Sequence, residues 1–372
     1  MKILLLNYEF PPLGGGAGNA TLHMLKEFSK YNNLEIDLVT SSVDKYKLES
    51  FSENIRIYKL PIGKNNQIHY QSNKDLLTYS IKAHTYCKKL LKQNSYQLVH
   101  AFFSTPCGII AYRLKQPYIV SLRGSDVPFY NQRFRVLDKL VFQRLSKTVW
   151  KNARAVIANS NGLKQLAFKT LPNFQFNVIY NGIDIERFIP KSTKEDTFTV
   201  LSTSRLIRRK GIEFLIKGFA KFIEKSRNSK LVLVGDGDQK GELINLVNSL
   251  GITNYVEFLG SVPHDEIAQI YRNSDAFVLP SFNEGMSNSI LEAMASGLPI
   301  ISTSTGGSEE LVSNNNGFIV EKENSEQIAE KLFTLYSNRE LVDKMGNESR
   351  KKAETMSWSN MAKEYFKIYK NV

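Results

Sequence analysis

The chain has 372 residues, 42% hydrophobic and 23% charged, which is typical of a folded soluble protein and long enough for two domains. No apolar run approaches the roughly 20 residues of a membrane span, and Ile3 to Leu6 is too short for a signal-peptide core. The two cysteines, Cys87 and Cys107, form no metal or disulfide pattern. We therefore expect reduced thiols in a cytoplasmic protein.

The formal net charge of +13 is unevenly distributed. Residues 1–185 contain 25 Lys and Arg against 11 Asp and Glu, and residues 186–372 contain 24 against 25. An anionic partner of the first half (a membrane surface, a lipid-linked phosphate or nucleic acid) is one interpretation. A solubilising basic surface is the other, and composition leaves both open.

The chain begins with an apolar run, residues 2–8, that predicts a buried parallel strand. EFPPLGGGAGN follows at residues 9–19, and its glycines would let a ligand approach the backbone closely. Strand, glycine-rich loop and helix are typical of a ligand-binding turn, although the spacing is not that of a nicotinamide-binding fingerprint. A merely flexible loop is the alternative.

Strands and helices then alternate, which predicts a doubly wound parallel sheet with ligands at the carboxyl ends of its strands. Near such ends lie His100, Arg123 and Asp126. Arginine is no general base near neutral pH but can clamp a phosphate, and Asp126 is a candidate polar contact. His100 could face the acceptor or sugar, but a lone histidine is more often a hydrogen-bonded strand residue.

Residues 131–154 carry seven Lys and Arg and one acid, with aliphatic residues at helical spacing. A basic amphipathic helix of this kind can lie on an anionic bilayer. An ordinary domain helix would instead turn the same apolar stripe toward the sheet. Attraction to a membrane requires only the basic face of the helix, so it is compatible with an apolar stripe that packs on the sheet. We therefore expect this segment to bind an anionic membrane surface.

The second half opens with a strand that runs into Arg205, and Lys210 and Gly211 precede the next helix. Two cations beyond the carboxyl end of a strand can neutralise a diphosphate, the alternative being a solvated basic loop. Arg208 and Arg209 are expected to be surface charges.

LPSFNEGMSNSILEAMASGLPIISTSTGG at residues 279–307 predicts strand, turn, helix and strand, with Ser287 as the helix N-cap. Unpaired amides at a helix start bind anions, and nearby carboxylates bind hydroxyls, which together suit a nucleotide sugar. A helix with two solvated acids is the alternative. The groups concerned are the amides of Gly285, Met286 and Ser287 and the carboxylates of Glu284 and Glu292.

EGMS, a second glutamate eight positions after the first, EAMASGLP and a Gly-Gly turn together resemble the retaining glycosyltransferases of family 4 (group 1). NGID with F-x-P at 178–190 and LVLVGDG at 231–237 add to a resemblance that covers most of the chain. It implies the α/β GT-B fold, with two Rossmann-like domains facing across a cleft. Their expected bounds are 1–185 on the acceptor side and 186–355 for the donor, with a helix over 356–372 crossing back to the first domain.

The resemblance also implies roles for single residues. It places Arg205 and Lys210 on the donor diphosphate, Glu284 and the amides after it on the sugar hydroxyls, and Glu292 on the ribose. Gly15 and Gly16 would lie near the donor. Many relatives have His-Gly where this chain has Arg123-Gly124, so the role of Arg123 is open.

We therefore expect a retaining, metal-independent glycosyltransferase without a cofactor, using a UDP- or GDP-linked sugar as co-substrate. The acceptor would be a glycan or lipid-linked hydroxyl in cell-envelope polysaccharide, lipopolysaccharide or glycolipid synthesis, at the cytoplasmic side of the membrane. A nucleotide-sugar epimerase shares the architecture but would turn over donor without acceptor. Nucleic acid is not an expected partner, because no helix-turn-helix, RNP or zinc pattern occurs.

Overall fold

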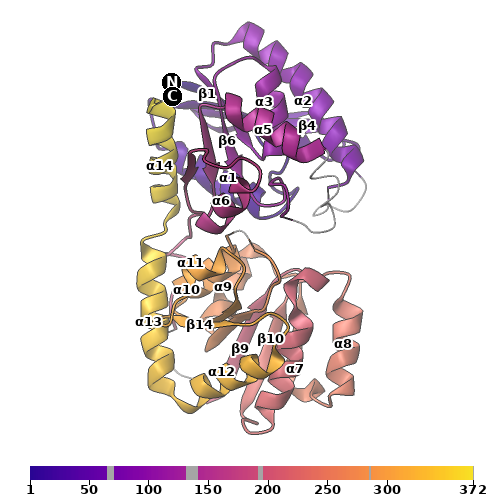
Figure 1. Ribbon diagram of the computed structural model, residues 1–372, viewed down its shortest axis with the longest axis vertical. Coiled ribbons are helices and arrows are strands. Elements are labelled where there is room, and N and C mark those ends of the chain that lie inside the picture. The colour runs from indigo at the N-terminus through magenta and orange to yellow at the C-terminus, as the bar shows by residue number, and fades with distance from the viewer. Residues whose placement is uncertain (65–70, 131–140, 192–195, 285, 372) are drawn as a thin grey trace. The chain divides into compact units, whose positions relative to one another are not determined.

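The computed structural model describes residues 1–64, 71–130, 141–191, 196–284 and 286–371 (Figure 1). It divides into two compact units, Met1–Gly182 with Trp358–Val372 (unit 1) and Ile183–Ser357 (unit 2). The chain thus passes between units at 182/183 and 357/358, where the sequence predicted 185/186 and 355/356.

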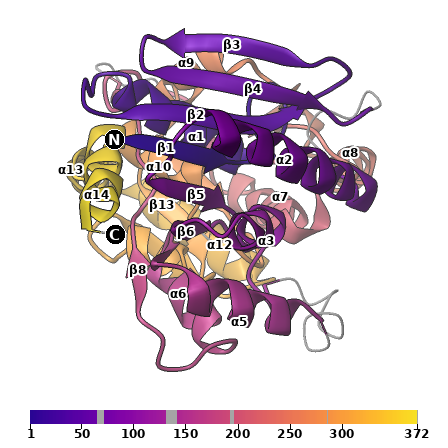
Figure 2. The same cartoon turned by 90° about the horizontal axis from the view of Figure 1, so that it is seen from above.

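Unit 1 is built on an eight-stranded sheet in the order β3-β4-β2-β1-β5-β6-β7-β8, and Figure 2 shows its strands one below the other, with β3 at the top. All neighbouring pairs are parallel except β3 with β4. The strands are β1 (Lys2–Leu6), β2 (Glu35–Ser42), β3 (Lys47–Ser52), β4 (Ile55–Pro61), β5 (Leu98–Phe102), β6 (Tyr118–Leu122), β7 (Ala155–Ala158) and β8 (Phe176–Val178).

The antiparallel strand β3 was not predicted. Its sequence, KLESFS, is polar and largely exposed, so it lacks the apolar run that marks a buried parallel strand. β3 lies at the edge of the sheet, where charged side chains discourage pairing with another chain. Glu49 lies 2.9 Å from the Lys59 ammonium on β4 and also pairs with Lys47.

The helices of unit 1 form two layers. In Figure 2, α2, α3 and α5 lie along one side of the sheet and α14 along the other. α14 packs against α1, where the rings of His23 and Trp358 stack at 4.7 Å. The helices are α1 (Gly16–Phe28), α2 (Asn73–Gln93), the π-turn η1 (Ser104–Gly108), α3 (Ile109–Arg113), α5 (Gln143–Asn152), α6 (Asn161–Phe168) and α14 (Trp358–Asn371).

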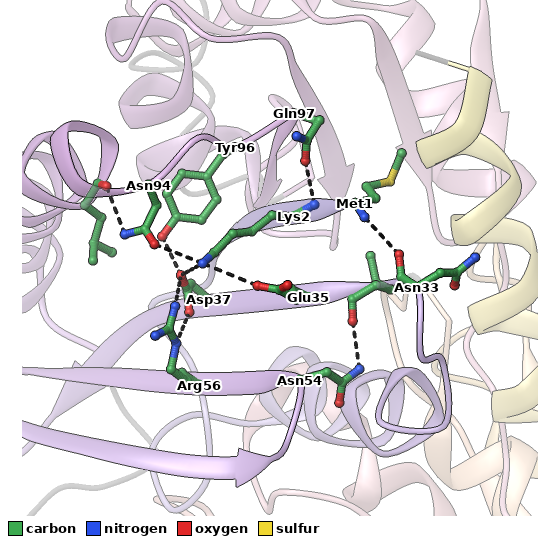
Figure 3. Close-up of polar contacts among 12 residues, drawn as sticks. Met1, Lys2, Asn33, Glu35, Asp37, Asn54, Arg56, Asn94, Tyr96 and Gln97 are labelled. Carbon is green, nitrogen blue, oxygen red and sulfur yellow. Dashed lines mark hydrogen bonds and ion pairs between the residues drawn. The ribbon is translucent and has the colours of Figure 1, made fainter.

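A charged cluster holds the amino-terminal edge of this sheet (Figure 3). The buried carboxylate of Asp37 accepts hydrogen bonds from Arg56 Nε at 2.8 Å and Nη2 at 3.0 Å, and from the Tyr96 hydroxyl at 2.5 Å. The Lys2 ammonium lies 3.7 Å from the same carboxylate. The buried Asp37 carboxylate is thus paired with charged and hydroxyl groups of the protein itself, which points to a structural role for this cluster.

Unit 2 contains a six-stranded sheet in the order β11-β10-β9-β12-β13-β14, with every neighbouring pair parallel. Its strands are β9 (Phe198–Thr203), β10 (Ser229–Val234), β11 (Val256–Gly260), β12 (Ala276–Leu279), β13 (Ile300–Thr303) and β14 (Gly317–Val320). Its helices are η4 (Arg208–Lys210), α7 (Ile212–Ile223), α8 (Lys240–Ser249), η5 (Thr253–Tyr255), α9 (His264–Arg272), α10 (Asn288–Ala295), α11 (Ser308–Leu311), α12 (Ser325–Ser337) and α13 (Arg339–Glu354).

Strand order reverses near the middle of each sheet. β1 pairs with both β2 and β5, and β9 pairs with both β10 and β12. At such a switch point the loops leaving the two strands diverge, and ligands bind outside the carboxyl ends. The prediction of two doubly wound α/β domains is confirmed, and the loops after β1, β5, β9 and β12 are where a site is expected. Across the described ranges, no helix has both the length and the apolar character to span a bilayer.

Candidate functional site

The loops after β9 and β12 meet at the switch point of unit 2. The backbone N–H of Phe282 donates to the carbonyl of Arg209 at 2.9 Å. Gly211 has a positive φ of 64°, and a Cβ there would lie 2.3 Å from the carbonyl oxygen of Pro280. Only glycine permits this contact, which brings the turn η4 onto the segment that follows β12.

This contact pairs Lys210 with Glu284. Their side chains form an ion pair and are only 12% and 11% exposed. Burial alone would raise the pKa of Glu284, but the charges of Lys210 and Arg209 outweigh it and hold the pKa below its usual value. Glu284 is therefore an ionised acceptor at neutral pH. The Lys210 ammonium has three N–H donors, so the pair leaves it donors for an anionic ligand.

The three arginines around this pair differ. Arg205, at the end of β9, is exposed, and its guanidinium makes no hydrogen bond or ion pair with any described residue. Arg208 is also exposed, as predicted. The prediction of a surface charge is wrong for Arg209, whose Nη1 donates to the carbonyl of Asn283 at 3.1 Å. The reason is the close contact of η4 with the loop after β12.

Glu292 lies in the first turns of α10, behind the N-cap. Ser287 is that N-cap, as predicted, and its Oγ accepts from the N–H of Ile290 at 3.4 Å. Glu292 Oε2 accepts from the Tyr271 hydroxyl at 2.8 Å. Burial raises the pKa of Glu292 to about 7, against the opposing effects of Tyr271 and the Arg187 charge. Glu292 therefore titrates near neutral pH.

Tyr271, in the last turn of α9, was not singled out from the sequence. Its ring is fully buried between Phe188 and Phe277, with centroids 5.6 and 5.8 Å away. Its hydroxyl also contacts the hydroxyl of Thr203, at the end of β9. Tyr271 thus fixes Glu292 relative to β9. In the sequence it could not be distinguished from an ordinary aromatic residue of the core.

The expected anion site at the start of α10 is described only in part. Gly285 lies outside the described residues, whereas Met286 is buried next to the N-cap. Glu284 forms an isolated parallel bridge with Gly306, in the loop after β13. This bridge fixes the backbone of Glu284, and the ion pair with Lys210 holds the carboxylate that was predicted to bind sugar hydroxyls.

The turn after β10 contains Asp236 and Asp238, a short Asp-x-Asp pattern of the kind that can bind a metal. The Asp236 carboxylate accepts from the N–H of Gly237 at 2.8 Å and from Lys240 at 3.2 Å. Within the described ranges, no group of three or more His, Cys, Asp or Glu is placed to hold a metal ion.

In unit 1, the glycine loop after β1 is open on one side. Gly15 is the N-cap of α1 and donates its N–H to Glu9 Oε2 at 3.2 Å, and Gly16 is the first helical residue. A Cβ at Gly15 would meet no described atom within 4 Å. This side of the Gly15 backbone is therefore open, and ligand binding there stays a prediction.

Asp126 joins the ends of β5 and β6. Its carboxylate accepts from the backbone N–H of Ser104 at 2.6 Å, of Arg123 at 2.8 Å and of Gly124 at 3.0 Å. Burial raises the pKa of Asp126, and these hydrogen bonds oppose that rise. Both carboxylate oxygens bind the protein's own backbone, so Asp126 organises the loop in which Arg123 lies.

Arg123 lies over the ring of Phe102, with its guanidinium carbon 5.2 Å from the ring centroid. Its Nη2 donates to Asn181 Oδ1 at 2.9 Å. Burial lowers the pKa of Arg123, with Tyr365 and Asp126 acting in the opposite direction. Arg123 is therefore held in place within unit 1 as a cation just after β6, over the end of β5.

His100 is buried inside β5. Its Nδ1 is 2.7 Å from the hydroxyl of Tyr369 on α14, and its Nε2 is 2.7 Å from the hydroxyl of Ser121 on β6. Burial lowers the pKa of His100 to about 3. A neutral ring with both nitrogens engaged favours the hydrogen-bonded interpretation over one facing the acceptor.

The basic segment 131–154 is described from residue 141 onward. Val149 and Trp150 of α5 are buried against the sheet, as the domain-helix alternative requires. Val141 and Leu145 are exposed. Of the aliphatic and aromatic side chains described in this segment, some therefore belong to the core and others are exposed on the surface.

Comparisons with known proteins agree with this architecture. A model of Glycosyltransferase Family 4 matches residues 14–187, and one of Glycosyl transferases group 1 matches residues 184–352. Together these matches extend over both units.

Individual proteins are similar along most of their length. An uncharacterised glycosyltransferase of Methanocaldococcus jannaschii is 28% identical over 100% of this chain and 98% of its own. The UDP-Gal:alpha-D-GlcNAc-diphosphoundecaprenol alpha-1,3-galactosyltransferase of Escherichia coli is 28% identical over 86% and 84%. The structure of sucrose-phosphate synthase from Thermosynechococcus elongatus superimposes with a TM-score of 0.86, covering 100% and 98%, at 20% identity.

The fold, the groups at the unit 2 switch point and the two family matches lead to one conclusion. The structural likeness shows the GT-B fold, and the family models match consecutive segments that meet near the boundary between the units. The chain is a glycosyltransferase and belongs to glycosyltransferase family 4, with a group 1 C-terminal domain.

Proposed function

We propose that the protein is a retaining enzyme that transfers a sugar from a nucleoside diphosphate sugar to a hydroxyl acceptor, without a metal ion or cofactor. The observation that carries the proposal is the convergence of cations and carboxylates after β9 and β12. Arg205 and Lys210 can neutralise a diphosphate, and Glu284 and Glu292 can accept hydrogen bonds from hydroxyls. UDP is favoured as the donor nucleotide, because the Escherichia coli relative is named for UDP-galactose.

Each group has one role in this proposal. Arg205 and Lys210 bind the diphosphate and stabilise the charge that develops as it leaves. Glu284, with the amides of Gly285, Met286 and Ser287, holds the sugar hydroxyls. Glu292, fixed by Tyr271, accepts hydrogen bonds from the ribose hydroxyls.

Retention is proposed to occur by attack on the same face that the diphosphate leaves. The bond between the anomeric carbon and the phosphate oxygen breaks, and the electron pair goes to the phosphate. The acceptor oxygen forms the new bond to that carbon and gives its proton to the departing phosphate. No covalent sugar–enzyme bond is involved, so mass spectrometry during turnover should detect no glycosylated protein.

The acceptor side is assigned to unit 1, where Gly15 and Gly16 provide exposed backbone and Arg123 provides a fixed cation. By resemblance to the family, Gly15 and Gly16 would lie near the donor. A glycan or lipid-linked acceptor is favoured, since the Escherichia coli relative is named for a diphosphoundecaprenol substrate. We place the enzyme in cell-envelope glycan synthesis at the cytoplasmic face of the membrane. There residues 131–154, of which 141–154 are described, would meet the anionic surface.

A thermal-shift panel of UDP, GDP, ADP and their sugar conjugates tests the proposal. A ligand at about 100 times its Kd stabilises a protein by about 2.7 kcal/mol, so one nucleotide family should raise the Tm by several degrees. Arg205→Ala should strongly reduce the shift, and Arg208→Ala, at a neighbouring exposed arginine, should preserve it. The absence of any shift in the wild-type protein would contradict the proposal. Consumption of donor without acceptor would instead indicate an epimerase.

A further inference from the structure

Helix α2 exposes aliphatic side chains that do not belong to the core. Leu77 is 63% exposed and Ile81 61%, the largest fractions among the exposed large hydrophobic side chains of the described residues. They are four residues apart and so lie next to each other on the helix surface. The opposite side of α2 is buried on the sheet through Tyr79, Ala83, Cys87 and Leu90.

The same surface of α2 is basic. The helix contains five lysines and one acid, Asp75, which caps the N-terminus and pairs with the Lys64 ammonium at 3.3 Å. At 100° per residue, Lys74, Lys88 and Lys92 fall within an arc of about 60° that also holds Leu77 and Ile81. These three lysines are exposed, and none forms an ion pair with a described residue.

The neighbouring helices of this layer have the same character. α3 and α5 follow α2 along one side of the sheet (Figure 2), and neither contains an acidic residue. Their exposed apolar side chains are Tyr112 and Leu145, and their exposed cations include Arg113, Arg144 and Lys151. We call the exposed residues of these three helices the basic face.

The other helical layer of unit 1 differs in its ion pairing. On α1, Glu27 lies 2.9 Å from the ammonium of Lys30, just after the helix. On α14, Lys367 pairs with Glu364 at 2.6 Å. α1 and α14 together contain four lysines and two glutamates, whereas α2, α3 and α5 together contain nine Lys and Arg and the single acid Asp75. Much of the basic excess of the first half therefore lies on α2, α3 and α5.

An anionic bilayer fits this combination better than a nucleic acid. Cations strengthen binding to the phosphate backbone of a nucleic acid, but isolated aliphatic side chains add little to it. Both kinds of side chain strengthen binding to an anionic bilayer, because aliphatic side chains enter the acyl boundary while the apolar stems of lysines let their ammonium groups reach the headgroups. We propose that the basic face, with Leu77 and Ile81 of α2 as its most exposed aliphatic side chains, docks on an anionic lipid bilayer. This places the principal contact on α2 rather than on residues 131–154, and it is consistent with the proposed lipid-linked acceptor.

Vesicle co-sedimentation of the full chain tests the docking. The wild-type protein should bind phosphatidylcholine vesicles that contain phosphatidylglycerol, bind pure phosphatidylcholine weakly, and dissociate as salt rises. Two double variants, Leu77→Gln/Ile81→Gln and Lys88→Glu/Lys92→Glu, should each lower the apparent affinity by about ten-fold or more. Both leave α2 with good helix formers.

Matched controls make the outcome decisive. Lys363→Glu/Lys367→Glu makes the same charge change at the same spacing on α14. Phe333→Gln removes an exposed aromatic ring on α12. Both variants should bind vesicles like the wild-type protein. Nucleotide-sugar thermal shifts should be normal in all variants, which separates failure of docking from failure of the proposed function. Absence of vesicle binding at low salt, or equal loss in the α14 control, would overturn the proposal. Unchanged vesicle binding by Leu77→Gln/Ile81→Gln, with strong DNA binding, would indicate a polyanion-binding face instead.

Discussion

Each of the two sheets has a switch point at its carboxyl edge, but the polar side chains near the two switch points are used differently. In unit 1, Asp126 is hydrogen-bonded to three backbone amides and His100 to two hydroxyls. In unit 2, Arg205 is exposed without a partner among the described residues, and Glu292 titrates near neutral pH. A switch point therefore provides only a location for a site. Whether its polar groups can bind a ligand depends on how many are already bound to the protein itself.

The largest effect should come from the carboxylate at the unit 2 edge. Glu284→Gln removes the charge that pairs with Lys210 and the acceptor proposed for the sugar hydroxyls. We expect turnover to fall by about 10²–10³-fold while the protein remains folded, as is usual when a single electrostatic contact of a transition state is lost. Steady-state kinetics with circular dichroism measure both, and Glu257→Gln, at an exposed carboxylate on β11, is the control. Near-wild-type turnover in Glu284→Gln would remove this residue from the site.

A smaller effect is expected at Arg205. Arg205→Ala removes a cation but leaves Lys210 and Arg209 in place, so kcat/KM for the donor should fall about ten- to one-hundred-fold. The same change at Arg208 should alter kcat/KM less than two-fold. If the two variants lost activity equally, the loop would act only through its total charge, and the contrast between the two edges would weaken.

The fold was largely predictable because a buried parallel sheet leaves a strong pattern. Apolar runs such as LVLVG and AFVLP, separated by amphipathic segments, specified the order of strands and helices. β3 escaped prediction because an exposed edge strand does not need that pattern. The end of α10 was also predictable, since Gly297 has the positive φ of 72° expected at a helix end.

The site was predictable where chemistry is local in sequence and not where it arises from packing. Lys210 and Glu284 stand out as charges next to glycine, at the ends of strands. Tyr271 and Arg209 do not, because their roles depend on which loops the fold brings together. Arg209 sits beside Arg208 in the chain, and only the contact of η4 with residues 280–284 distinguishes the two.

The pH dependence of donor binding provides a third test. Glu292 has a folded-state pKa of about 7, so it gains its negative charge as pH rises through neutrality. Affinity for an intact nucleotide sugar, whose phosphates do not titrate in this range, should increase about ten-fold between pH 6 and 8 if the ionised form binds the ribose. The Tyr271 hydrogen bond lowers this pKa, so Tyr271→Phe should shift the midpoint to higher pH, and Glu292→Gln should abolish the dependence. Calorimetry would show a flat wild-type profile if the ribose is bound elsewhere.

The smallest effect on catalysis is expected at His100, where the two interpretations make opposite predictions. Because its folded pKa of about 3 lies below the ordinary 6.5, the neutral ring stabilises the fold above pH 6.5, and this stability is lost as pH falls toward 3. His100→Gln breaks the links to Ser121 and Tyr369, so the free energy of unfolding at pH 7.5 should drop by about 1–2 kcal/mol, and the deficit should shrink on acidification. The kcat should change less than two-fold. Denaturant titration and kinetics on the same preparation distinguish the two interpretations. A loss of turnover with unchanged stability would show that His100 acts on the reacting groups and does not merely hold α14 in place.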